Sequence, residues 1–92
     1  MPQSRPSRDF KKSPQYVEEC HNYGLRVREL RQKAGLTLEH ASSVAELDLA
    51  HWQKIEAGKV NVTLGTMIRV ANALDAKLAD FFPVMRRRRA LR

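Results

Sequence analysis

Few side chains in this sequence have the types and spacing that metal binding or catalysis requires. The possible metal ligands of the soft and imidazole type are three histidines and one cysteine, His21, His40, His51 and Cys20. Only Cys20 and His21 are adjacent, and paired ligands about two to five residues apart are missing, so no metal is expected. The sequence also lacks a carboxylate pair, a Ser/Cys–His constellation and a phosphate-binding loop. We therefore expect no enzyme and no cofactor.

Cys20 is the only cysteine, which excludes a disulfide within the chain and a thiolate metal site. A small apolar filler on a helix is the favoured interpretation, and a reactive thiol is the alternative. A single unpaired cysteine fits a reduced, cytoplasmic compartment.

The chemistry that remains is cationic. The 92 residues include 17 Lys and Arg against 10 Asp and Glu, a net charge of +7. Residues 21–82 carry eight basic and seven acidic side chains, so five of the seven net charges come from the C-terminal arginines, Arg86, Arg87, Arg88, Arg89 and Arg92. Three roles for this run remain open: a phosphate-binding arm, a protein-docking patch and a solubilising end.

The composition divides the chain into three parts. Residues 1–12 are rich in Pro, Ser and charge and have little to bury, so we expect a flexible N-terminal arm. Residues 13–83 form the predicted domain, and residues 84–92 form a basic tail. No apolar run approaches the length of about 18 residues that a membrane span needs, and no membrane association is expected.

A long helix is predicted at the start of the domain. Ser13 can cap it and Pro14 suits its first position. Apolar side chains then recur at steps of three and four residues, at Tyr16, Cys20, Tyr23, Val27, Leu30 and Ala34. Gly24 lies inside this stripe, where the helix could kink or begin, and Gly35 can end it.

Four shorter helices follow, and no segment alternates like a strand, so the fold class is compact all-α with five helices. Their expected ranges are Leu38–Ala45 after Thr37, Leu49–Ala57 after Asp48, Leu64–Leu74 after Thr63, and Leu78–Phe82 after the poor cap Lys77.

Two of these helices lie close enough in sequence to form a helix-turn-helix over residues 38–57. Ser42 provides the small side chain that a close helix crossing needs, and Leu47 can fill the corner. Trp52 and Ile55, three residues apart, are expected in the core. A helix-turn-helix can place its second helix in the major groove of DNA, so a DNA contact is the alternative for Trp52.

Residues from Val27 to Phe82 resemble the lambda repressor and Cro-type (XRE) helix-turn-helix family. The resemblance is carried by residues 26–37 (RVRELRQKAGLT), 55–59 (IEAGK), 63–67 (TLGTM), 71–74 (ANAL) and 78–82 (LADFF). It implies a five-helix lambda-repressor-like domain that binds double-stranded DNA.

The resemblance also implies roles for individual residues. Base contacts would come from Leu49, Ala50 and Lys54. Phosphate contacts would come from Thr37, Leu38, His51, Gln53, Lys59 and Asn61. Arg31 and Glu56 match positions that often form a buried ion pair, the alternative being two solvated charges.

Three departures from the family pattern concern the same region. Leu38 stands where a phosphate-contacting glutamine is common, and Leu49 and Ala50 replace polar base-contacting residues. Leu49 and Ala50 can touch a thymine methyl but cannot make bidentate hydrogen bonds. Glu46 replaces a turn glycine, which predicts a left-handed conformation at some strain.

The expected function is therefore a sequence-dependent, DNA-binding transcriptional regulator. A homodimer on a two-fold symmetric site would supply the specificity that one helix lacks. Its interface would use the apolar C-terminal residues Leu78, Phe81, Phe82, Val84 and Met85. The alternative is an antitoxin or adaptor that uses the same fold to hold a protein partner.

Overall fold

The computed structural model describes residues 8–82, and every regular secondary-structure element in this range is a helix. The predicted all-α class is confirmed, with four α-helices and two short 3₁₀-helices in the described residues. The elements are η1 (Arg8–Lys12), α1 (Pro14–Lys33), α2 (Leu38–Ala45), α3 (Leu49–Glu56), α4 (Leu64–Ala73) and η2 (Leu78–Phe81).

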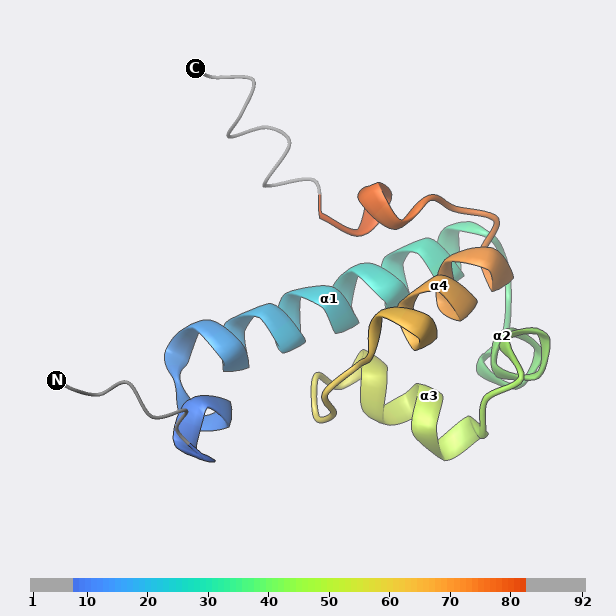
Figure 1. Ribbon diagram of the computed structural model, residues 1–92. Coiled ribbons are helices and arrows are strands. Elements are labelled where there is room, and N and C mark those ends of the chain that lie inside the picture. The colour runs from blue at the N-terminus through green and yellow to red at the C-terminus, as the bar shows by residue number, and fades with distance from the viewer. Residues whose placement is uncertain (1–7, 83–92) are drawn as a thin grey trace, which may run out of the picture.

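The long helix α1 runs through the centre of the arrangement, and the other elements lie beside it (Figure 1). Helix α3 packs under α1, while α2 packs against both α3 and α4. The C-terminal η2 closes over α1 and α4, and η1 folds back against the start of α1. The two helices of the predicted helix-turn-helix, α2 and α3, thus lie on one side of α1.

A core of ten side chains holds these helices together. Trp52, Ile55, Val27 and Val70 are almost completely buried, and Ala41 beside them is 0% exposed. The expected burial of Trp52 is confirmed. A small residue at position 41 of α2 leaves the volume that a large indole on α3 requires.

Local capping explains where the helices begin. The side chains of Ser13, Thr37 and Thr63 accept hydrogen bonds from backbone N–H groups three residues later, at 3.2, 3.0 and 3.1 Å. Each such bond satisfies one of the orphan donors at a helix start. The three predicted starts are therefore confirmed.

Both ends of the described chain differ from expectation. Residues 8–12, assigned above to the flexible arm, form η1, and the ring of Phe10 lies 5.3 Å from that of Tyr16, edge to face. The fifth helix is a 3₁₀-helix, since its hydrogen bonds from Asp80 to Lys77 and from Phe82 to Ala79 span three residues. The segment has only four residues and ends before Pro83. Short segments of this kind commonly form 3₁₀-type hydrogen bonds.

Tyr23 is the one buried aromatic side chain with an unsatisfied polar atom among the described residues. Its ring packs on Phe81 and Phe82, with centroids 5.5 and 6.1 Å away. Its hydroxyl has no hydrogen-bond partner within residues 8–82. Burial raises the pKa of this phenol well above its ordinary value. The neutral form is therefore favoured in the folded state.

Tyr23→Phe is expected to raise the free energy of unfolding by about 1 kcal/mol at neutral pH, because the variant buries no unpartnered hydroxyl. The folded pKa is raised, so the contribution of Tyr23 is complete below pH 10.0, the pKa of an exposed tyrosine, and is lost as pH rises further. Urea unfolding at neutral and alkaline pH measures both effects. An equal alkaline loss of stability in the two proteins would contradict this assignment.

Candidate nucleic-acid interface

The turn between α2 and α3 has the tight geometry of a helix-turn-helix. Glu46 adopts the left-handed conformation, with φ 60° and ψ 42°. The backbone N–H of Leu47 donates to the carbonyl of Ser42 at 2.9 Å, which closes the end of α2. Arg69 of α4 donates to the Glu46 carbonyl at 3.3 Å. The strain predicted for a non-glycine residue here is thus located at Glu46, and these hydrogen bonds hold the turn in place.

Small side chains on α2 allow α3 to cross it closely. Ala41, Ser42 and Ala45 are all buried. The Ser42 hydroxyl donates to the carbonyl of Glu39 at 3.1 Å, so its polar atom is satisfied inside the crossing. Leu47 packs against the core at the corner, as expected.

Helix α3 has one buried and one outward face. Trp52, Ile55 and Glu56 are buried, whereas Ala50, Gln53 and Lys54 are exposed. Leu49 and His51 are half-buried, so they lie at the edges of the outward face. The structure therefore places the predicted α3 contact residues together on or beside one surface.

The other predicted contact residues flank this face. Thr37 is exposed, but its hydroxyl oxygen already accepts the His40 N–H. Leu38 is half-buried and packs against the core. Lys59 and Asn61 are exposed in the segment between α3 and α4.

A network of charged and polar side chains fixes the far end of α3. Arg31 meets Glu56 as a fork, with Nε 2.6 Å from Oε2 and Nη2 3.2 Å from Oε1. Its third nitrogen donates to the carbonyl of Leu36 at 2.9 Å. The indole N–H of Trp52 also donates to Glu56, at 2.7 Å. The more exposed Arg28 lies 3.5 Å from the same carboxylate.

Glu56 remains ionised inside this network. Burial alone would raise the pKa of the carboxyl, but hydrogen bonds from Arg31 and Trp52 and the charge of Arg31 together lower it below its usual value. The carboxylate is thus compensated where it is buried. The role of Trp52 as its donor was missed at the sequence level, although the i, i+4 spacing of Trp52 and Glu56 was a usable signal.

A glycine anchors the segment after α3 to α1. Gly58 has φ +73°, and a Cβ there would lie 2.8 Å from the Cα of His21. The N–H of Lys59 donates to the Lys54 carbonyl at 2.9 Å, so the chain reverses directly after α3. Lys59 is consequently held beside the end of α3, and Asn61 follows it two residues later.

The model of a family described as "Helix-turn-helix domain" matches residues 22–81, about two thirds of the chain. The chain belongs to the helix-turn-helix domain family. The resemblance to XRE-type regulators, inferred from sequence motifs, is thereby confirmed.

Two solved structures resemble this helix-turn-helix protein. The restriction-modification controller protein C.AhdI from Aeromonas hydrophila is 32% identical, with a TM-score of 0.69 over 71% of this chain and 98% of that one. The clp gene regulator ClgR from C. glutamicum is 24% identical, with a TM-score of 0.67 over 68% of this chain and 82% of that one. No curated protein matches the chain.

The predicted dimer residues fall into three groups. Phe81 is 3% exposed and belongs to the core of this helix-turn-helix domain, while Leu78 and Phe82 are half-buried. Val84, Met85 and the arginine run lie outside the described residues. Of the predicted set, Leu78 and Phe82 therefore retain accessible apolar surface in the described structure.

Residues 8–82 contain no group of three His, Cys, Asp or Glu placed to hold a metal ion. No helix within that range has both the length and the apolar character needed to cross a lipid bilayer.

Proposed function

We propose that this helix-turn-helix protein is a DNA-binding transcriptional regulator that contacts duplex DNA through α3. The observation that carries the proposal is the two-faced character of α3, whose inner face is fixed by the Glu56 network while Gln53 and Lys54 project outward. The two similar structures are described as a controller protein and a gene regulator, which supports the same function.

The contacts follow from the outward face. Lys54 is the long cationic side chain of α3, and its ammonium group can contact guanine O6 and N7 in the major groove. Leu49 and Ala50 would touch thymine methyl groups. Phosphate contacts would come from His51 and Gln53 of α3 and from the flanking residues Thr37, Leu38, Lys59 and Asn61.

A homodimer on a two-fold symmetric site completes the proposal. One short helix spans too few base pairs for high specificity, and two-fold pairing doubles the site. Leu78 and Phe82 offer apolar surface for the interface, with Val84 and Met85 following them in the sequence.

Selection from a random duplex library tests the proposal, and a two-fold symmetric motif is the expected product. Lys54→Ala should then weaken binding to the selected site by about 1–3 kcal/mol and reduce base discrimination at one position in each half-site. The matched control is Lys77→Ala, an exposed lysine at the start of η2.

Two other results would contradict the proposal in different ways. An equal loss for Lys54→Ala on every sequence would make Lys54 a phosphate contact. A library without any enriched motif, combined with partner capture that Lys54→Ala abolishes, would favour the antitoxin or adaptor function.

A further inference from the structure

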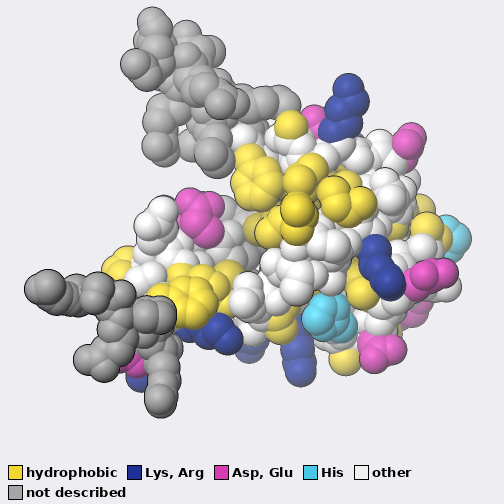
Figure 2. Space-filling view, in the orientation of Figure 1, with side chains coloured by type: hydrophobic (Ala, Val, Ile, Leu, Met, Phe, Trp, Pro, Cys, Tyr) yellow, Lys and Arg dark blue, Asp and Glu magenta, His cyan; other side chains and the backbone are white. Residues whose placement is uncertain are grey.

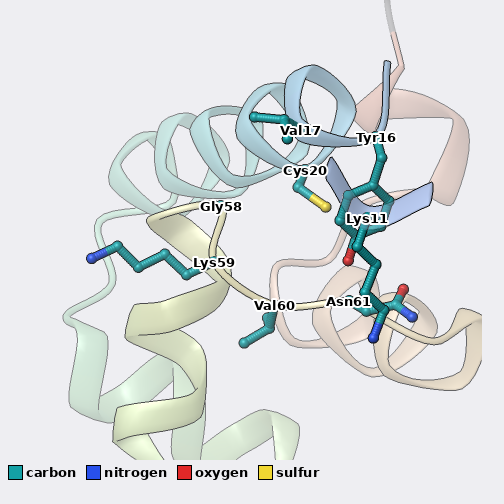
Figure 3. A pocket seen from close by; sticks show the side chains of 8 residues that line it. All are labelled: Lys11, Tyr16, Val17, Cys20, Gly58, Lys59, Val60 and Asn61. Atoms are coloured by element: carbon teal, nitrogen blue, oxygen red, sulfur yellow. The ribbon is translucent and has the colours of Figure 1, made fainter. Parts of the chain in front are cut away.

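A pocket lies between the N-terminal extension, which is η1 with the first turns of α1, and the segment that follows α3 (Figure 3). Its volume is about 340 Å³. One wall comes from η1 and the first turns of α1, and the other from the α3–α4 segment. The lining residues are Lys11, Tyr16, Val17, Cys20, Gly58, Lys59, Val60 and Asn61.

Half of this pocket lies outside the family match. The match covers residues 22–81, whereas Lys11, Tyr16, Val17 and Cys20 precede it. The N-terminal extension therefore adds a feature that membership of the helix-turn-helix family does not explain. The other half belongs to the segment that carries Lys59 and Asn61, two of the proposed phosphate contacts.

The lining has the chemistry of an anion site. It combines the Lys11 ammonium, the Tyr16 hydroxyl and the Asn61 amide, and it contains no carboxylate. In Figure 3 the side chains of Lys11, Tyr16 and Asn61 extend into the same region. Burial and the neighbouring Cys20 raise the pKa of Tyr16, so its hydroxyl stays protonated and can donate. Such donors suit a phosphate oxygen.

We propose that this pocket binds a phosphate of the DNA backbone that flanks the α3 site, an inference that rests on the proposed function. The N-terminal extension then contributes a phosphate contact from outside the helix-turn-helix. Lys11 is its main cation, and Tyr16 and Asn61 orient the phosphate oxygens.

The location favours a backbone phosphate over a free small anion. Lys59 extends away from the pocket on the other side of the α3–α4 segment (Figure 3), so cations lie on both sides of it. In Figure 2, Lys and Arg side chains follow the lower edge of the molecule, from the region of η1 towards that of α3. A row of cations along an edge suits the successive phosphates of a DNA strand, whereas a single isolated cation would suit a free anion.

The salt dependence of DNA binding provides the first test. Lys11→Gln in the full chain should reduce the slope of log K against log salt by about 0.9, the value for one phosphate contact. Lys77→Gln removes the same charge from the exposed residue just before η2 and should leave the slope unchanged. Lys11 is exposed, so its loss should also leave the thermal midpoint unchanged.

Cys20 provides a direct probe of the pocket, since it lines the pocket and is the only cysteine. A selected duplex with flanking base pairs should slow the alkylation of Cys20 by N-ethylmaleimide, and a duplex without flanks should slow it less. Protection by inorganic phosphate but by neither duplex would assign the pocket to a free anion and overturn the inference.

The results also separate this inference from the proposed function. An unchanged slope for Lys11→Gln, with site-specific binding and the Lys54 effect intact, would overturn the pocket assignment alone. If the unmodified protein showed no site-specific DNA binding, both the pocket assignment and the proposed function would be overturned.

Discussion

Replacing Arg31 with alanine is expected to lower the free energy of unfolding by about 3–5 kcal/mol, because the change leaves a buried carboxylate without its main partner. The Glu56 side chain is 4% exposed and that of Arg31 is 12% exposed. Arg31 supplies two of the donors to this carboxylate and also binds the Leu36 carbonyl. The shift in the urea midpoint, at an unchanged dependence on urea, measures the loss.

Arg28→Ala is the matched control, since it removes the same type of side chain from the same carboxylate. Arg28 is 51% exposed and lies 3.5 Å from Glu56, so its loss should cost about 0–1 kcal/mol. Equal and small effects of the two substitutions would show that the Arg31–Glu56 contact contributes little.

The pH dependence of stability provides a second test of the Arg31–Glu56 pair. The pKa of Glu56 is lowered in the fold, so its contribution is complete above 4.5, the value of an exposed glutamate, and is lost as pH falls through the folded pKa. Stability measured between neutral and acidic pH should therefore fall less steeply in Arg31→Ala than in the unmodified protein.

The parts of the fold that could be predicted are those that depend on local chemistry. Thr37 and Thr63 cap helices whatever lies elsewhere, and the spacing of Trp52 and Ile55 determines the inner face of α3. The outward face of α3 follows from the same period. The sequence therefore predicted which α3 residues face outward, while their contacts with DNA remain a proposal.

Other features depend on contacts between segments that are distant in sequence. The pocket joins Lys11 to Asn61, fifty residues apart, and no local pattern indicates that pairing. Phe10 gives η1 an aromatic partner in Tyr16, which the charged and proline-rich composition of the first twelve residues concealed. The contact of Arg31 in α1 with Glu56 in α3 also joins distant segments, and only the family resemblance indicated it.

Gly24 shows most clearly that a tertiary contact can determine which residue a position requires. Local reasoning predicts a weak point in a helix, yet α1 is one helix from Pro14 to Lys33. A Cβ at Gly24 would lie 2.4 Å from the carbonyl oxygen of Ile55 and 2.6 Å from that of Glu56. The glycine is required because α1 and the end of α3 touch there.

Gly24→Ala is accordingly expected to lower the free energy of unfolding by about 3 kcal/mol, although alanine favours a helix by about 1 kcal/mol. The clash is with backbone atoms, so α3 must move away from α1, and the contacts of Glu56 with Arg31 must lengthen as well. Urea unfolding measures the loss. The control is Gly65→Ala in α4, where the new Cβ finds its nearest neighbour at 3.9 Å. That variant should gain about 0.4–1 kcal/mol, so the same substitution in two helices should have opposite signs. A gain at both positions would mean that α1 and α3 do not approach as closely as the structure places them.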